Sequence, residues 1–409
     1  MGNRSDPERP GLGCVVDELS LSQREALTTI VDALACEREV VLTGAAGTGK
    51  TTLLKHLVKY LGDRGATAVF AAPTGKAAVR LSEVIGCGAT TIHKRLYGRV
   101  DDDEAGGEGL VFGEPHAPCE PGEVLVVDEA SMVGTELYND VMSELPRRSQ
   151  VIWVGDREQL QPVNDDWGPD LRNATAHLTE IFRQAGGSPI IGFATAIRTR
   201  RAGAFSRLWG DDDPRLTLRG GDVASAVSWA VERAREGADS TLITYTHRVR
   251  ERANAAIREQ LGFRAPIEVG DRLCVKMNSD ALGLMNGQVI EVSGVVDHTI
   301  AGVRAYAITY VGGYESVFVL HELLNTRDRR VWDLRREFGR RKWDELRIIH
   351  AWHGHCLTVH SSQGSQWDEV GFIQGSALRR MWREDSDAAR RLTYTAVTRA
   401  AEALTVFRS

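Results

Sequence analysis

The sequence predicts an α/β protein with two parallel-sheet domains, a small insertion in the first and a β-rich insertion in the second. Three observations predict this fold. Short apolar strands alternate with helical patterns through residues 40–175, the alternation returns from residue 241, and β-rich runs with glycine-rich turns interrupt it between residues 289 and 320. Alternating strands and helices indicate a parallel sheet, and 409 residues exceed what one core normally accommodates.

The first half supplies four strands that each end in a polar cluster. After a loose polar tail, a helix is expected with Ser22 as its N-cap and Glu25 at its third position. The four apolar strands are Val40–Leu42, Ala68–Ala71, Val124–Val127 and Val151–Val154. Because parallel sheets bind ligands beyond the carboxyl ends of their strands, the polar clusters are expected to meet in one cleft.

The first strand runs into a segment that matches Gly-x4-Gly-Lys-[Ser/Thr], the loop that wraps nucleotide phosphates. Its glycines let several backbone N–H groups face one anion, and the positive end of the next helix adds to that field. Lys50 is expected to reach the outer phosphates, and Thr51 the magnesium ion. The nucleotide-binding residues predicted here are Gly44, Ala45, Ala46, Gly47, Thr48, Gly49, Lys50, Thr51 and Thr52.

Polar residues after the third and fourth strands have a direct use beside such a loop. Asp128 can hold the magnesium ion through water, and Glu129 can orient and deprotonate the water that attacks the terminal phosphate. Gln159 is expected to sense the same phosphate from the fourth strand. The sequence therefore predicts ATP and Mg²⁺ as the cofactors.

The second half repeats the strand and helix alternation without a second phosphate loop, so it is expected to lend residues to the first site. Its β-rich run indicates a small antiparallel barrel or meander. The predicted boundaries are 1–18 for the flexible tail, 19–175 for the first domain, 96–122 for its insertion, 176–290 and 348–409 for the second domain, and 291–347 for the β-rich insertion.

Composition and charge limit the possible ligands and the cellular location of the protein. A formal charge of -6 gives no overall basic field, so a polyanion has to be held by a local groove. Six scattered cysteines without a Cys-x2-Cys pair fit a reducing compartment. The polar first residues lack the apolar core of a signal peptide and no run approaches a membrane span, so a cytoplasmic protein without a membrane partner is expected. His350, His353 and His355 lack a familiar metal-ligand spacing.

The order of these motifs resembles the superfamily 1 helicases, and within them the branch that includes RecD, the TraI helicase domains and the phage Dda helicase. The resemblance covers residues 19–405. It implies two RecA-like domains, an SH3-like domain at 291–347 and a strand-separating pin within 96–122. It also implies that Gln23 contacts adenine and that Arg183 and Arg399 reach the γ-phosphate from the second domain.

The resemblance extends to motifs that face DNA. The first-domain motifs are Ala72–Ala78 and Thr90–His93, and the second-domain motif is Leu357–Ser365. The implied nucleic-acid contacts are Pro73, Thr74, Gly75, His93, Phe112, Thr358, His360 and Ser361. Two residues depart from the family pattern: Ser361 stands where the family usually has lysine, and Gln161 replaces a proline.

The resemblance implies an ATP-dependent DNA helicase that moves 5′ to 3′ on single-stranded DNA and separates duplexes, in replication, recombination or repair. Single-stranded DNA, duplex junctions and replication or recombination proteins are the implied partners of an expected monomer. The alternative is an ATP-gated clamp or recruitment factor on single-stranded DNA without processive unwinding, against which the intact Glu129 counts. A small-molecule kinase is disfavoured by the arginine motifs of the second half.

Overall fold

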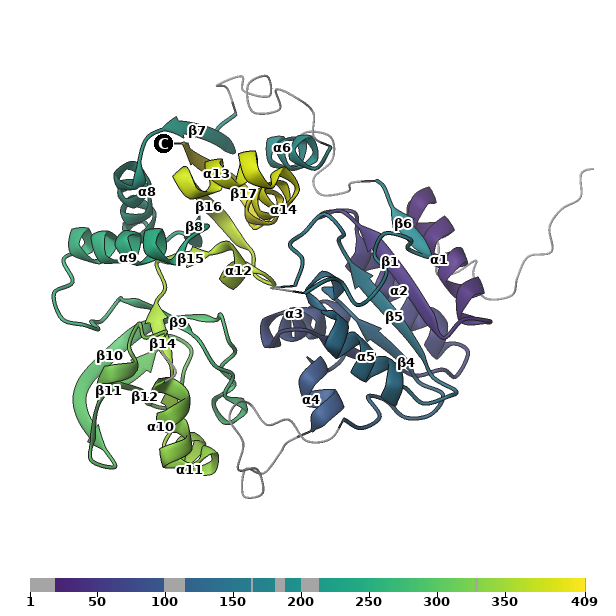
Figure 1. The fold of residues 1–409 in the computed structure, drawn as a ribbon, viewed down its shortest axis with the longest axis horizontal. Helices are drawn as coiled ribbons and strands as arrows, with labels where there is room; N and C mark the ends of the chain where they lie inside the picture. The colour runs from purple at the N-terminus through teal and green to yellow at the C-terminus, as the bar shows by residue number, and fades with distance from the viewer. Residues whose placement is uncertain are drawn as a thin grey trace, which may run out of the picture.

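Three sheets organise the chain in this computed structural model (Figure 1). The first domain lies on the right of Figure 1, the second at the upper left, and the β-rich insertion at the lower left. The structure describes residues 19–98, 115–162, 165–180, 188–199, 213–327 and 330–408. No helix in these ranges is long and apolar enough to cross a membrane.

The first domain is built on a parallel sheet of order β3-β2-β4-β5-β1-β6. Its strands are β1 (Glu39–Gly44), β2 (Ala68–Ala72), β3 (Ala89–Thr91), β4 (Val124–Val127), β5 (Gln150–Gly155) and β6 (Ala176–Leu178). Its helices are α1 (Leu21–Leu34), α2 (Lys50–Gly62), α3 (Gly75–Ile85), α4 (Ile92–Tyr97), α5 (Thr135–Glu144) and the 3₁₀ turn η2 (Ala130–Met132).

Alternate side chains of each strand supply two separate cores. Val40 and Leu42 of β1 pack with α1 and α2, whereas Val41 packs with α4 and α5 on the other face. A strand with both faces covered reads as a continuous apolar run, as these strands do. The parallel arrangement was predicted correctly, and it places every strand's carboxyl end at one edge of the sheet.

The start of α1 differs from the prediction. Ser20, rather than Ser22, is the N-cap: its Oγ accepts a hydrogen bond from the backbone N–H of Gln23, and the Gln23 side chain accepts one from the backbone N–H of Ser20. The predicted cap was wrong because Ser20 is the last residue with extended backbone angles before the helix.

The second domain is a parallel sheet of order β15-β8-β16-β17-β7. Its strands are β7 (Leu216–Gly220), β8 (Ser240–Thr244), β15 (Cys356–Thr358), β16 (Trp367–Gln374) and β17 (Ala400–Arg408). Its helices are α6 (Pro189–Arg198), α8 (Val223–Arg235), α9 (His247–Leu261), α12 (Val359–Ser362), α13 (Ser376–Glu384) and α14 (Ser386–Val397).

The insertion forms a mostly antiparallel sheet of order β13-β12-β11-β10-β9-β14, in which only the β12 and β13 pair among these described strands is parallel. Its elements are β9 (Arg272–Val275), η3 (Asp280–Leu282), β10 (Val289–Ile300), β11 (Val303–Tyr310), β12 (Val317–Leu320), η4 (His321–Leu323), α10 (Arg330–Phe338), α11 (Arg340–Glu345), β13 (Ile348–Ile349) and β14 (Ala351–His353). Its likeness to an SH3 domain stays a prediction.

Sheet membership moves two of the expected boundaries. β6 pairs with β1, so the first sheet continues past residue 175. β9 pairs with both β10 and β14, so the third sheet extends beyond 291–347 on both sides. In the first-domain insertion, Leu96 and Cys119 are buried in the core, and residues 99–114 lie outside the described part of the chain.

Candidate functional site

The phosphate loop lies between β1 and α2, as predicted. Gly47 and Gly49 adopt φ angles of 82° and 75°, in the left-handed region that side chains avoid. The hydroxyl of Thr48 donates to the Ala45 carbonyl at 2.9 Å and is buried, which fixes the turn. Lys50 Nζ donates to the carbonyls of Gly44 at 2.7 Å and Ala45 at 3.2 Å, so the ammonium lies over the loop.

The two acids follow β4 at the same edge of the sheet. Asp128 Oδ1 accepts from the backbone N–H of Glu129 at 2.9 Å. Burial, followed by the charge of Glu129, raises the pKa of Asp128 to about 6, although the Glu129 N–H, Lys50 and Arg80 act in the opposite direction. Glu129 has φ 52°, a conformation that costs a non-glycine residue about 1–3 kcal/mol and is concentrated at active sites.

These groups fit a nucleotide with a divalent cation. Left-handed glycines open the backbone toward an anion, and a carboxylate whose ionised form is penalised by burial gains most from a bound cation. One carboxylate with a hydroxyl and phosphates suits magnesium. Elsewhere in the described ranges, no group of three or more His, Cys, Asp or Glu could hold a metal.

Asp128→Asn is expected to stabilise the metal-free protein above pH 6. The pKa of Asp128 is raised from 3.8 to about 6 in the fold, so the folded state holds its proton more tightly and stability falls as pH rises from 4 to 6. The shift corresponds to at most about 3 kcal/mol, which the neutral asparagine recovers.

Urea unfolding in EDTA at pH 8, 6 and 4 measures this gain. The difference between the variant and the parent protein should be largest at pH 8 and shrink toward pH 4. Equal stabilities at pH 8 would show that the Asp128 carboxylate is not strained by its surroundings.

The phosphate loop is hydrogen-bonded directly to the second domain. The hydroxyl of Tyr394, on α14, accepts from the backbone N–H of Ala46 at 2.9 Å and donates to Asp156 Oδ2 at 2.8 Å. Tyr394 is 1% exposed, and burial with the nearby Asp156 raises its pKa well above the ordinary value. A pocket lined by Ala45, Ala46, α6 and Tyr394 adjoins this contact.

Arg399 reaches the same place from the end of α14. It is buried, and its guanidinium donates to Thr395 O at 2.9 Å, Thr398 Oγ1 at 3.1 Å and Ser365 O at 3.3 Å. Burial lowers its pKa, whereas the carboxylate of Glu129 in the first domain acts to raise it. The structure therefore brings this predicted arginine within electrostatic reach of the acid that follows β4.

The two predicted glutamines are both buried. Gln23 Nε2 donates to the Gly49 carbonyl at 3.3 Å, so this side chain supports the phosphate loop, and its contact with adenine stays a prediction. Gln159 lies in the loop after β5, which is joined to α14 by several contacts. These contacts include Asp156 with Tyr394, Leu160 N with Thr395 Oγ1 at 3.0 Å, Glu158 with Arg390, and Arg391 with the Gln159 carbonyl at 3.4 Å.

Two predicted residues lie outside the described part of the chain: Arg183, expected to reach the γ-phosphate, and Phe112, expected in the pin. Tyr394 is the converse case, because the sequence predicted no role for it and the structure places it against the phosphate loop. The signal was its position beside Arg399 in Tyr-Thr-Ala-Val-Thr-Arg.

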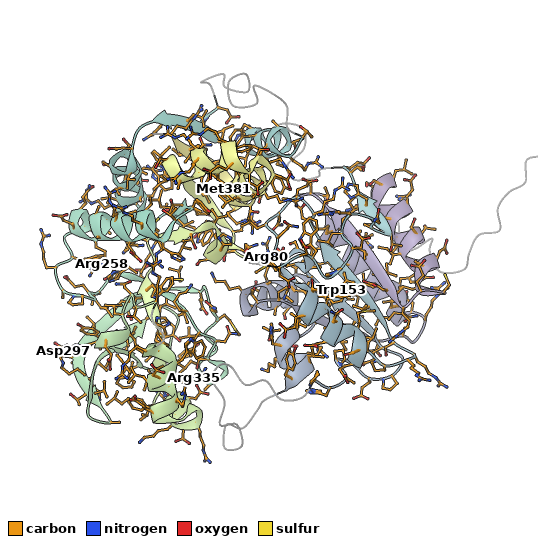
Figure 2. The ribbon with its side chains drawn as sticks, in the orientation of Figure 1. Arg80, Trp153, Arg258, Asp297, Arg335 and Met381 are labelled. Carbon is orange, nitrogen blue, oxygen red and sulfur yellow. The ribbon has the colours of Figure 1, made fainter. Side chains whose placement is uncertain are left out.

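The motifs expected to face DNA meet where the two domains approach each other. Thr74 caps α3, and the Cα of Gly364 lies so close that an added Cβ would be 3.3 Å from Thr74 Oγ1. Lys76 Nζ donates to Ser365 Oγ at 2.8 Å, and Arg80 Nη2 donates to Gln366 Oε1 at 2.9 Å. Figure 2 shows Arg80 on the side of the first domain that faces the second.

The other residues expected to contact DNA lie either at this meeting point or on α4. Thr358 is buried and caps α12, His360 is exposed, and Ser361 Oγ accepts from Thr358 Oγ1 at 3.0 Å. Pro73 directly precedes Thr74 in the loop after β2. His93 lies on α4, its ring 5.9 Å from that of Tyr97.

The histidines near β14 have structural partners. His350 Nε2 bonds Thr326 O at 2.9 Å, His353 Nε2 bonds Pro266 O at 2.9 Å, and His355 Nε2 bonds Asp271 Oδ1 at 3.0 Å. Burial lowers the pKa of all three, which suits neutral imidazoles in a core.

Comparisons with known proteins agree with this geometry. Residues 18–212 match the AAA domain family, and residues 353–407 match the UvrD-like helicase C-terminal domain family. The chain is 40% identical over 201 residues to the ATP-dependent RecD2 DNA helicase of Deinococcus radiodurans, covering 48% of this chain and 26% of that protein. It is 29% identical over 414 residues to the RecBCD enzyme subunit RecD of Mycolicibacterium smegmatis, covering 88% of this chain and 66% of that protein.

Among solved structures, the fold is similar to that of Bacteroides Pif1 bound to single-stranded DNA, with a TM-score of 0.55, 17% identity and coverage of 95% of this chain and 92% of that one. The chain thus spans from about a quarter to just under two thirds of the length of the curated relatives named above. The chain is therefore similar to the superfamily 1 helicases of the branch that includes RecD, through its matches to both domain families and its relatives RecD2 and RecD.

Proposed function

We propose that this chain is an ATP-dependent DNA helicase that moves 5′ to 3′ along single-stranded DNA and separates duplex DNA. The observation that carries the proposal is the hydrogen bond from Ala46 N–H in the phosphate loop to Tyr394 of the second domain. A nucleotide bound at this loop lies against both domains. Its binding and hydrolysis therefore act on the contact between them.

In the proposed reaction, the loop N–H groups and Lys50 bind the phosphates of ATP. Thr51 and Asp128 would hold Mg²⁺, which neutralises charge on the phosphate oxygens when bound. Glu129 orients the attacking water and accepts its proton. Arg399 stabilises the charge that spreads over the transferring phosphoryl group, and Arg183 is proposed to assist from its motif.

The loop after β5 is proposed to transmit the state of the nucleotide. This loop carries Gln159 and is fixed to α14 through Asp156 and Leu160. The far end of α14 continues into Arg399, which donates to the Ser365 carbonyl in the motif expected to face DNA. Helix α14 thus contacts both the nucleotide site and the motif expected to face DNA. A change at the terminal phosphate of the nucleotide therefore shifts the groups that hold the DNA strand.

The DNA substrate and partners are proposed from the relatives. The named relatives are DNA helicases or a RecBCD subunit, and the similar Pif1 structure holds single-stranded DNA. Single-stranded DNA, duplex junctions and a recombination partner are therefore the proposed ligands. The segment 96–122, with Phe112, is the proposed wedge.

Unwinding of tailed duplexes tests direction and activity together. The protein is expected to hydrolyse ATP faster with single-stranded DNA and to separate a duplex that carries a 5′ tail but not one with a 3′ tail. Separation of the 3′-tailed duplex alone would reverse the proposed direction. DNA-stimulated ATP hydrolysis without any separation would support the ATP-gated clamp instead.

A further inference from the structure

Two lysines come together where the first domain, the second domain and the insertion meet. Lys76 is at the start of α3, and Lys276 directly follows β9. Lys76 Nζ donates to Ser365 Oγ at 2.8 Å, and Lys276 Nζ donates to Ser361 Oγ at 3.4 Å. Both hydroxyls belong to the second-domain motif Leu357–Ser365, so each ammonium faces a neutral group from another part of the chain.

The backbone and an aromatic ring hold Lys276 in place. Its backbone N–H donates to the His350 carbonyl at 2.9 Å, and its ammonium lies 4.4 Å from the ring centroid of Trp352. Trp352 is 8% exposed and is held by a hydrogen bond from its Nε1 to Thr326 O at 2.7 Å. The attraction between a cation and the face of a buried indole holds the ammonium in a fixed direction.

Lys76 is confined in a similar way. Gly287, from the loop between β9 and β10, has φ +84°, and a Cβ added there would be 3.8 Å from Lys76 Nζ and 3.4 Å from Ser361 O. Gly75 packs so closely on Met285 that a Cβ would be 2.2 Å from its sulfur. The insertion loop therefore sits directly on the start of α3, and both ammonium groups border the same contact.

Charge in this cluster is not neutralised by the described residues. No ion pair in those ranges joins Lys76 or Lys276 to a carboxylate. Burial, with a smaller contribution from the charge of Lys276, lowers the pKa of Lys76 to about 8. Burial, with a smaller contribution from the charge of Arg250, also lowers the pKa of Lys276. Both lysines are half-buried without a carboxylate partner in the described part of the chain, so an anion between them would offset the cost of removing their charges from water.

We propose that Lys276 and Lys76, with the hydroxyls of Ser361 and Ser365, bind a backbone phosphate of single-stranded nucleic acid. This inference rests on the proposed function and adds an anion-binding element from the insertion, which the sequence motifs do not include. The four groups come from three parts of the chain. The phosphate that they bind is thus held most firmly in one relative position of the domains.

The test measures binding of a fluorescent oligo-dT by anisotropy, without nucleotide, over a range of salt concentrations. Lys276→Ser is expected to weaken binding about tenfold, as for loss of one charged hydrogen bond. It should also reduce the slope of log K against log salt by about 0.7, because one fewer phosphate charge on a single strand is neutralised. Lys276→Gln, which keeps most of the packing on Trp352, should give the same loss.

An exchange of positions is the sharper test. Because the Lys276 ammonium lies 3.4 Å from Ser361 Oγ, the double variant Lys276→Ser with Ser361→Lys returns one cation to the same place. It should recover most of the affinity and the full salt slope. Lys342→Ser, which removes an exposed lysine of α11 in the same insertion, is the matched control and should bind like the parent.

An oligomer of abasic sites separates contacts to phosphate from contacts to bases. The proposal expects the same fold loss for Lys276→Ser on abasic and oligo-dT strands. A loss on oligo-dT alone, unchanged affinity and salt slope in both single variants, or failure of the exchange in a protein that melts at the parental temperature would each overturn it. If the parent itself bound neither strand, the proposed function would fail instead.

Discussion

Arg399→Ala is expected to lower ATP turnover by about a thousandfold or more, the effect that an arginine supplied across a nucleotide cleft has in related chemistry. The guanidinium is buried, and its three hydrogen bonds, to Thr395, Thr398 and Ser365, remain within its own domain. Its charge nevertheless acts on Glu129 in the first domain. Alanine removes this charge from the site and leaves the phosphate loop intact.

Steady-state hydrolysis at saturating single-stranded DNA measures the loss as kcat. Binding of an oligonucleotide without nucleotide should change by no more than about threefold, because the phosphate contacts on the strand side are kept. Arg383→Ala, on the exposed side of α13, is the matched control for removing an arginine from this domain. Parental turnover in Arg399→Ala would remove the residue from the site and with it the proposed closure of the two domains.

The parallel sheets could be predicted because their signals are local. Each strand from β1 to β5, apart from the three-residue β3, contains a continuous apolar run, and its end is marked by glycine, proline or acids. The Gly-Lys-Thr loop and the acids after β4 follow from that order, since neighbouring parallel strands end at the same edge. Their convergence needed no knowledge of distant contacts.

The edges of the domains could not be predicted in the same way. β6, β9 and β14 have three or four residues each, too few for a periodic pattern. β14 pairs with β9 across more than seventy intervening residues, and β6 joins β1 at the far edge of the first sheet. Such pairings are chosen by tertiary packing, which overrides local preference.

Side-chain roles were missed for the same reason. The hydroxyl of Tyr394 contacts the Ala46 N–H, 348 positions away, and Lys276 reaches Ser361 across 85 positions. Neither contact can be predicted from the residue type, because a buried tyrosine and a lysine after a strand are both common. Ser361 shows the consequence most clearly: the sequence lacks a cation at this position, and the fold places Lys276 beside it, from the loop that follows β9.

Glu129→Gln is expected to lower kcat by about a hundredfold to ten-thousandfold while ATP still binds, because glutamine keeps the shape of the side chain but cannot accept a proton from water. The substitution preserves the backbone at φ 52°, since both residues bear the same strain there. Binding of ATP should persist through the Lys50 loop, which Glu129 does not contact by any hydrogen bond among the described residues.

This variant also decides between the two functions that the chain could serve. A translocase held in its ATP-bound form should keep its grip on single-stranded DNA and lose all strand separation, measured on the 5′-tailed duplex. Glu136→Gln, an exposed acid of α5, is the control and should behave as the parent. If Glu129→Gln hydrolysed ATP and separated strands at the parental rate, another base would have to activate the water, and the left-handed backbone at Glu129 would need a purely structural explanation.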